Sequence, residues 1–501
     1  VMLVREHRVA GQAQLLGAGQ PAANLVHSRL PEGTRLLFRT ATTFGDGAVF
    51  NFLGPITPER LTGPNGQTAA VDVAWGLQVT WDLLHQVLGR RGPDGQGGGL
   101  VAEVHANLQP YAPYANAYWD TASRTLHFGD GGSGYLPFTS LDVVAHELGH
   151  ALMSATADLA YSGEPGGLSE ATSDILAMAA LCYAAGGATG PTLTVPPGFP
   201  WLLGTSLHPE GRPLRSLKQP SSQGMMDAWF DGMAIFSVYA NSGPASRCFY
   251  YLSMGHDPLD ATAASPHLPR AFPGIGITPA LRTWVRALEA HLTDRQSGYD
   301  AMRQATLAAA GELFGATSPE RAAVENAWAA VNVGPPAGEG TAPRLRLAPG
   351  PWPGGLGSGI HTSSSRDVYV GLGGAAPLPP VVLEGFSGTP ALTWSGGYAK
   401  VDPIKGTLQP SSWNLVGWST SFEVRVNGTP HRAMGMLHPV ALDMDGDGEV
   451  DASDAAVLAI YSLSGVLPDD VFTPDTLQVY FPPDPAIYRW NRAFQALLET
   501  R

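Results

Sequence analysis

The spacing of apolar residues changes along the chain and divides it into stretches with different expected structure. Up to about residue 70, alternating runs such as TRLLFRT and GAVFNFLG predict half-buried strands. Residues 70–90 repeat apolar positions at helical spacing, then GLVAEVHANLQ reads as a strand and NAYWDTASRTLHFGDG as a hairpin. Residues 139–334 are mostly helical, and after 344 the pattern alternates again. Within the helical stretch the period returns at residues 226–241, 279–292, 298–314 and 319–332.

These changes predict several domains, because 501 residues are too many for one core. We expect an α+β fold with a β-rich N-terminal lobe over 1–158 and a helical C-terminal lobe over 159–334. The segment VGPPAGEGTAP contains the expected linker, residues 335–343. A β-rich accessory domain over 344–440 and a tail with short helices over 441–501 would follow.

Composition limits the partners of this chain. The formal charge is −14, only three of the 29 basic residues are lysines, and no basic patch with interleaved aromatics occurs, which argues against nucleic acid. No apolar run reaches the ~18 residues of a membrane span. The opening VMLVREHRVA lacks a signal-peptide pattern, so we expect a processed, secreted form or a chain that never used that route. Cys182 and Cys248 allow one disulfide, which the sequence leaves undecided.

The stretch VVAHELGHALMS, residues 143–154, carries the strongest chemical signal. His146 and His150 are four residues apart, so on a helix they share one face and can bind one ion. Glu147 follows the first histidine, where it can accept a proton from a metal-bound water. Thr139 with Asp142 resembles a helix capping box. The opposite face of this helix is apolar and comprises Leu141, Val144, Ala145, Leu148 and Leu152.

A second helix supplies the remaining ligand. In GGLSEATSDILAMAAL, Glu170 and Asp174 are also four residues apart, on an otherwise apolar helix. Two buried carboxylates are costly unless each has a partner. A zinc ion for Glu170 and a zinc-bound histidine for Asp174 would satisfy both. A helix with two internally satisfied histidines is the alternative, and it gives these acids no partner.

These motifs resemble the thermolysin family of zinc endopeptidases. HELGH and GGLSEATSDI match the two ligand helices, with nineteen residues between His150 and Glu170. NAYWD at 116–120 resembles the substrate-binding edge strand, and LRSL at 214–217 the segment with a substrate-binding arginine. ANSGPASRCFYYLSMG and GIGITPALRTWVRAL resemble later helical motifs. The resemblance covers roughly residues 30–334 and implies a thermolysin-like two-lobed peptidase, with the active cleft between the lobes.

The resemblance implies a role for each matching residue of the catalytic centre. Glu147 would be the general base, Asp174 would orient His146, and Tyr161 would stabilise the oxyanion, although Tyr161 could also be a packing residue. Zn²⁺ would be held by His146, His150 and Glu170.

The resemblance also implies how protein or peptide substrates bind. Arg215 would contact a substrate carbonyl, with a structural salt bridge as the alternative. Val143 and Leu214 would line a pocket for a bulky apolar residue after the scissile bond. The substrate backbone would pair with Asn116, Ala117 and Trp119.

Two positions depart from the family pattern. The family's second oxyanion donor is a histidine two residues before its NSG, and here that position is Tyr239. A phenol can also donate a hydrogen bond, so we expect Tyr239 to replace it; weakened activity, or entry of His208 or His256, are the alternatives. The family's pair of calcium ions should be absent, because Leu181 stands where a carboxylate is expected.

The tail holds a candidate calcium loop in LDMDGDGEVDASDAAVLAIY, residues 442–461. Gly448 occupies position 6, where the chain must turn sharply, and the other spacings suit oxygen ligands for Ca²⁺. The loop resembles half of a dockerin module, and no second loop is found. An acidic surface turn is the alternative. The predicted ligands are Asp443, Asp445, Asp447, Glu449, Asp451 and Asp454.

The accessory stretch leaves two further expectations. We expect Trp394, Trp413 and Trp418 to be core residues rather than exposed binding aromatics. Residues 344–501 offer a possible docking surface for a carrier or surface partner, so deleting them should abolish localisation and spare peptide turnover. The rival function is a catalytically weak or inactive peptidase-fold protein with a binding role.

Overall fold

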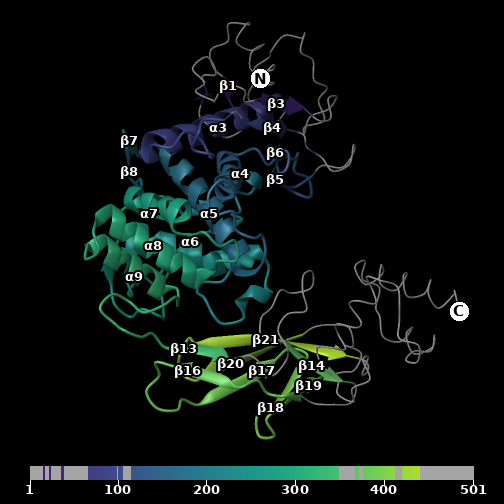
Figure 1. Cartoon of the computed structure of the whole chain (residues 1–501). Coiled ribbons are helices and arrows are strands. Elements are labelled where there is room, and N and C mark those ends of the chain that lie inside the picture. The colour runs from purple at the N-terminus through teal and green to yellow at the C-terminus, as the bar shows by residue number, and fades with distance from the viewer. Residues whose placement is uncertain are drawn as a thin grey trace, which may run out of the picture. The chain divides into compact units, whose positions relative to one another are not determined.

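The computed structural model describes part of the chain in atomic detail, and Figure 1 shows its elements. Contacts divide the chain into two units. The first unit comprises Val1–Trp229 and Phe236–Gly340, and the second comprises Phe230–Ile235 and Thr341–Arg501. The described residues are 15–16, 22–23, 35–38, 66–98, 100–104, 106, 114–348, 367–371, 376–411 and 420–440.

The first unit begins with a four-stranded sheet and a long helix. The strand order is β3-β4-β6-β5, in which β3, β4 and β6 are parallel and β5 is antiparallel to β6. Helix α3 ends just before Gly89, whose φ of 67° stops a right-handed helix. The elements are β1 (Leu15–Leu16), β2 (Ala22–Ala23), β3 (Arg35–Phe38), α3 (Gly66–Leu88), β4 (Val101–Val104), β5 (Ala117–Asp120) and β6 (Thr125–Phe128).

Three helices follow, α4 (Leu141–Ser154), α5 (Gly163–Cys182) and α6 (Val238–Met254), and α5 packs against both others. Helix α5 is buried along most of its length, which is why its sequence is apolar and small on nearly every side. The predicted apolar face of α4 is buried at all five positions. Close approach depends on glycine, because a Cβ on Gly149 would lie 2.4 Å from Ser173 Cα.

The helical part continues as the sequence predicts in three places and differs in one. Helices α7, α8 and α9 fall within two residues of the expected periods. The helix expected over 226–241 is wrong, because α6 begins only at Val238 and Gly232 has a φ of 90°. The apolar spacing there comes from Trp229, Phe230 and Met233, which are buried in non-α-helical backbone. The helices are α7 (Ile277–Ala290), α8 (Tyr299–Phe314) and α9 (Pro319–Ala330).

Short elements connect these helices. Hairpin strands β9 and β10 pair in antiparallel fashion and lead into the cleft described below. The remaining short elements are β7 (Ala188–Thr189), β8 (Thr192–Leu193), β9 (Leu202–Leu203), β10 (Arg215–Ser216), β11 (Gly255–His256) and β12 (Phe272–Pro273), the π-helix η2 (Tyr183–Gly187) and the 3-10 helices η3 (Thr205–Leu207), η4 (Pro220–Gln223) and η5 (Met233–Ile235).

The second unit is built from strands in its described residues. Its sheets have the orders β14-β21-β20-β17, β15-β19-β18 and β13-β16. Trp394 is half-buried and stacks on Phe422 at 6.4 Å between ring centroids, which agrees with a core position, whereas Trp413 and Trp418 lie outside the described residues. The strands are β13 (Arg344–Leu347), β14 (Asp367–Gly371), β15 (Ala376–Pro377), β16 (Val381–Glu384), β17 (Leu392–Gly396), β18 (Ala399–Asp402), β19 (Thr407–Pro410), β20 (Thr420–Val426) and β21 (Arg432–Val440).

The described residues also bear on the possible disulfide and on membrane-spanning helices. Cys182 and Cys248 are both buried free thiols, so they form no disulfide. Among the helices that the structure describes, none is both long and apolar enough to cross a membrane.

Candidate active site

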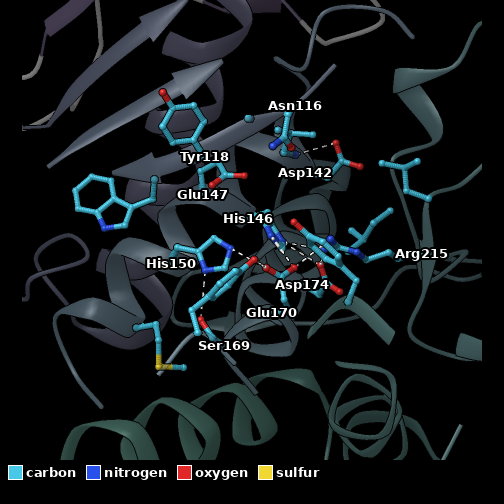
Figure 2. Close-up of a pocket in the computed structure, with 18 of the residues that line it drawn as sticks. Asn116, Tyr118, Asp142, His146, Glu147, His150, Ser169, Glu170, Asp174 and Arg215 are labelled. Atoms are coloured by element: carbon cyan, nitrogen blue, oxygen red, sulfur yellow. Dashed lines mark hydrogen bonds and ion pairs between the residues drawn. The ribbon is translucent and has the colours of Figure 1, made fainter. Parts of the chain in front are cut away.

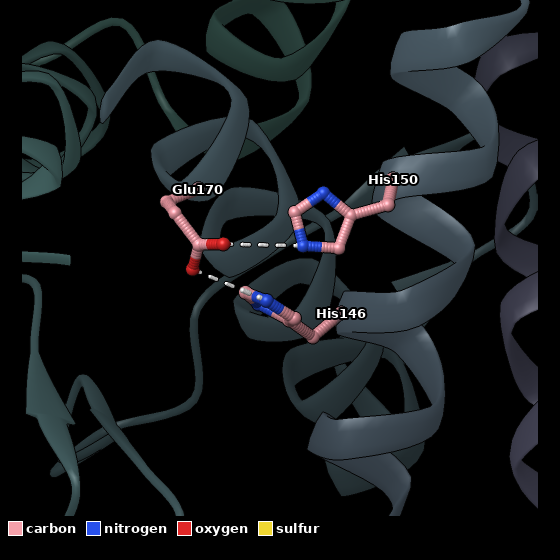
Figure 3. A group of neighbouring side chains, drawn as sticks. All are labelled: His146, His150 and Glu170. Carbon is pink, nitrogen blue, oxygen red and sulfur yellow. Dashed lines mark ion pairs between the residues drawn. The ribbon is translucent and has the colours of Figure 1, made fainter. Parts of the chain in front are cut away.

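Helices α4 and α5 bring the three predicted zinc ligands together (Figure 3). The imidazole rings of His146 and His150 have centroids 4.8 Å apart. Glu170 reaches them from α5, with 3.5 Å between its Oε2 and His146 Nε2 and 3.3 Å between its Oε1 and His150 Nε2. One ligand atom from each residue lies within 4.8 Å of the others. We call these three residues the zinc triad.

Buried polar residues orient both histidines of the triad. The carboxylate of Asp174, which is 0% exposed, lies 2.9 Å from His146 Nδ1. Ser169 Oγ lies 3.4 Å from His150 Nδ1. With its Nδ1 occupied, each imidazole directs Nε2 toward Glu170, which suits a metal ligand. Ser169 was not predicted, although its position directly before Glu170 on the same helix was a usable signal.

Arg215, on β10, reaches Asp174 and Glu170 from one side of the site (Figure 2). Its guanidinium forms ion pairs with Asp174 at 2.5 Å and with Glu170 Oε2 at 3.1 Å. Burial alone would raise the pKa of Glu170, but the charge of Arg215 and the hydrogen bonds of the two histidines hold it well below its usual range. Arg215 therefore forms the salt bridges that the sequence offered as the alternative to a contact with substrate.

Glu147 is buried without a complete set of partners. It is 5% exposed, and its Oε2 has no hydrogen-bond partner among the described residues. Burial raises the pKa of this carboxyl, while His146 and His150 act in the opposite direction. A buried carboxyl oxygen without a partner is costly. A water held by an ion at the zinc triad would satisfy it, so these residues fit a catalytic zinc.

Two partly exposed tyrosines, Tyr161 and Tyr239, lie beside Glu170 and Arg215, respectively. Tyr161 is 55% exposed, and its hydroxyl donates a hydrogen bond to Glu170 Oε1. Burial of that hydroxyl and the Glu170 carboxylate raise the pKa of Tyr161, so it stays a protonated donor. Tyr239 is 47% exposed, its phenol also raises the pKa of Tyr161, and its ring centroid lies 5.2 Å from Arg215 Cζ. Both phenols are therefore available to a molecule in the cleft.

Family models match this region from the sheet to the last helix. One described as "Thermolysin metallopeptidase, catalytic domain" matches residues 33–154, and one described as "Thermolysin metallopeptidase, alpha-helical domain" matches residues 157–333. The chain belongs to the thermolysin family of metallopeptidases. Its fold is therefore the thermolysin-like one that the motifs predicted, and the metal of this family's active site is zinc.

Curated relatives agree with this assignment. The transglutaminase-activating metalloprotease of Streptomyces mobaraensis is 40% identical over 286 residues, which are 56% of this chain and 36% of that protein. Bacillolysin of Brevibacillus brevis is 33% identical over 273 residues, which are 53% of this chain and 46% of that protein. Thermolysin of Alicyclobacillus acidocaldarius is 32% identical over 273 residues, with shares of 53% and 45%. The chain thus spans less than half the length of these relatives.

The cleft of this family member has a volume of about 840 Å³ and contains the predicted substrate-binding positions. Asn116 and the start of β5 lie along it (Figure 2). In the described sheet, β5 pairs with β6 on one side and with no strand on the other, so β5 is an edge strand. Val143 and Leu214 line the cleft together with Leu203, which gives it an apolar part.

His208 and His256, the alternative donors to Tyr239, are engaged elsewhere. His256 Nδ1 donates to the Arg270 carbonyl, and its Nε2 accepts from the Ser265 amide at 3.0 Å. His208 contacts the guanidinium of Arg212. Neither histidine belongs to the described residues that line the cleft. Of the three side chains that the sequence offered for the position, Tyr239 is the one that lines the cleft.

Asp142 has a different function from the predicted cap. The helix begins after Ser140, with no side-chain cap bond, so the capping box with Thr139 is wrong. The Asp142 carboxylate instead accepts from the Gly204 amide at 2.6 Å, the Val143 amide at 3.1 Å and Ser140 Oγ at 2.5 Å. Asp142 thereby fixes the loop after β9 directly. The predicted calcium loop over 443–454 lies outside the described residues.

Proposed function

We propose that this chain is a zinc-dependent endopeptidase that cuts on the N-terminal side of bulky apolar residues in proteins or peptides. The observation that carries the proposal is the convergence of the zinc triad within 4.8 Å, beside the buried Glu147 oxygen that has no partner among the described residues. Ligand atoms on two packed helices hold this arrangement before any substrate arrives. Such preorganisation is what hydrolysis of a stable amide needs.

In the proposed reaction, Glu147 accepts a proton from the attacking water and then delivers it to the leaving amine. Zinc, when bound by the triad, polarises the scissile carbonyl and lowers the pKa of water toward ~7. Asp174 and Ser169 keep the imidazoles oriented through the cycle. Tyr161 and Tyr239 donate hydrogen bonds to the developing oxyanion. We assign Tyr239 as the second donor because its exposed phenol lies beside Tyr161.

Substrate would lie along β5 as an added strand. Asn116, Ala117 and Trp119 would then provide pairing positions at the sheet edge. The residue after the scissile bond would enter the apolar part of the cleft at Val143 and Leu214. Because Arg215 also lines the cleft, it can contact a substrate carbonyl while it remains paired with the acids.

The test is cleavage of an internally quenched peptide library by the wild type and by Glu147→Gln, with zinc measured in both. The amide keeps the size of the side chain and removes the base. We expect cuts before Leu, Phe or Ile by the wild type alone, with zinc in both proteins. Glu312→Gln, which changes an exposed carboxylate far from the triad in sequence, is the matched control. Zinc in both proteins and cleavage by neither would refute the proposal.

The inactive binding protein is not favoured. Its only support was Tyr239, and that phenol stands in the cleft beside the other donor. Tyr239→Phe removes the hydroxyl and keeps the ring over which Arg215 lies. We expect this change to lower kcat about 10- to 100-fold with little change in KM. Unchanged kcat would remove Tyr239 from the mechanism without affecting the peptidase proposal.

Three further proposals rest on sequence alone. The six oxygen ligands between Asp443 and Asp454 would bind one Ca²⁺, which calcium titration of the chain before and after Asp447→Asn would test. Residues 344–501 would dock on a carrier or surface. Secretion would bring the peptidase to its substrates, and fractionation of the producing cells is the check.

A further inference from the structure

The cleft extends along helix α4 and passes the zinc triad on its way. Val143, which borders the apolar part of the cleft, stands one turn before His146, and Ser154 stands one turn after His150. The rise of an α-helix places Val143 and Ser154 roughly 16 Å apart along its axis. Because the residue after the scissile bond is proposed to enter beside Val143, the residues before that bond should extend toward Ser154.

Polar side chains line the cleft at its Ser154 end. Thr121 Oγ1, in the turn after β5, lies 3.4 Å from Ser154 Oγ. Asp158 and Arg295 also line the cleft, and they form an ion pair with 3.1 Å between Asp158 Oδ2 and Arg295 Nε. Their side chains are 49% and 65% exposed, respectively. All four residues belong to the first unit, so this end of the cleft is complete within it.

The backbone holds the Asp158–Arg295 pair beside the last turn of α4. The Asp158 amide donates to the Met153 carbonyl at 2.8 Å, and both sequence neighbours of Asp158 are buried. The Arg295 carbonyl accepts from the Ala160 amide, also at 2.8 Å. Asp158 and Arg295 are therefore fixed to one short segment, which leads directly into Tyr161.

The guanidinium of Arg295 keeps unused donors. Its Nε donates to the Asp158 carbonyl at 2.8 Å, while its two Nη groups donate to no residue that the structure describes. An arginine carries five N–H donors in a planar fork, and its two Nη groups match the two oxygens of a carboxylate. Arg215, the other arginine that lines the cleft, is already paired with Glu170 and Asp174. Arg295 is therefore the cleft arginine with donors left for a ligand.

We infer that Arg295 selects substrates with an acidic side chain at the second or third residue before the scissile bond. The inference rests on the proposed function and adds a second specificity to the apolar pocket. The position follows from lengths: the end of α4 lies roughly 6 Å beyond His150 along the axis, and an extended peptide advances ~3.3 Å per residue. The salt bridge to Asp158 fixes the guanidinium and reduces its net charge, so the preference should be modest.

The test uses internally quenched peptides with Leu after the scissile bond and Glu, Gln or Lys at the second or third residue before it. At low salt we expect the wild type to favour Glu over Gln about two- to fivefold in kcat/KM, the range for an exposed ion pair. Added salt should weaken this preference. Arg295→Gln should abolish it and leave kcat/KM for the Gln peptide unchanged, whereas Arg295→Glu should favour Lys.

Arg286→Glu is the matched control, because Arg286 is also an exposed arginine paired with an acid but does not line the cleft. This control should keep the wild-type preference for Glu.

Three results would overturn the inference. One is a wild type that cleaves the Glu and Gln peptides equally or favours Lys, and another is a preference for Glu that survives in Arg295→Gln. The third is an equal loss of kcat/KM for all three peptides in Arg295→Gln, because Arg295 would then bind the substrate main chain. Cleavage before Leu without an acidic preference refutes only this inference, whereas a wild type that cleaves no peptide refutes the proposed function.

Discussion

Replacing Asp174 by asparagine tests how much the buried carboxylate contributes to zinc binding. Asp174 is 0% exposed and neutralises both His146 Nδ1 at 2.9 Å and Arg215 at 2.5 Å. Loss of an orienting partner typically costs 10- to 100-fold in metal affinity, or about 1.4 to 2.7 kcal/mol. We expect the upper end of this range. Without the Asp174 charge, Glu170 would be the remaining carboxylate of the two that pair with Arg215, and Arg215 would compete with the ion for it.

The assay is a competition titration of zinc against a chromogenic chelator at neutral pH, with kcat/KM measured on the zinc-saturated proteins. Ser173→Ala is the control, since it changes a buried residue next to Asp174 whose hydroxyl has no hydrogen-bond partner among the described residues. The control should bind zinc like the wild type. A folded Asp174→Asn variant with a zinc Kd within about twofold of the wild type would refute the reasoning.

Two substitutions and one pH dependence give the remaining predictions. Gly149→Ala places a Cβ 2.4 Å from the α5 backbone and should destabilise by about 3 kcal/mol in urea unfolding, whereas Gly340→Ala meets nothing within 4 Å and should be neutral; equal stabilities would contradict this packing. Asp142→Ala leaves the buried Gly204 amide without its acceptor and should cost about 1 to 3 kcal/mol, seen as a lower Tm. Burial alone would lower the pKa of His146, but Asp174 and Glu170 raise it to about 10 in the metal-free protein, so zinc must displace a proton. Apparent zinc affinity should therefore rise with pH up to about 10, and calorimetry in buffers of different ionisation enthalpy should detect the released proton; a pH-independent affinity would be inconsistent with this pKa.

The segment Phe230–Ile235 shows why one stretch misled the prediction from sequence. Its apolar residues repeat at a spacing that also suits a helix, and Gly232 interrupts a helical pattern without excluding it. What prevents the helix is the partner, because Asp231 bonds to residues more than a hundred positions later in the chain. The spacing of apolar residues indicates that one side of a segment is buried. It cannot indicate which distant strand covers that side.

The outcome for Asp142 shows the same limit. The sequence predicted a helix capping box formed by Thr139 and Asp142. It could not show that the Gly204 amide donates to the carboxylate of Asp142, 62 positions earlier in the chain. Hydrogen bonds of this kind form between residues that only the fold brings together.

The sequence by itself determined which side chains form the candidate metal site of this protein. His146 and His150 share a helix face, as do Glu170 and Asp174, because spacing within one helix sets which side chains are neighbours. Only the tertiary structure decided that Arg215 pairs with both acids, that Tyr239 rather than His208 or His256 lines the cleft, and that Asp231 belongs to the second unit. Those facts depend on how separate elements pack, and packing is set by contacts between residues far apart in the chain.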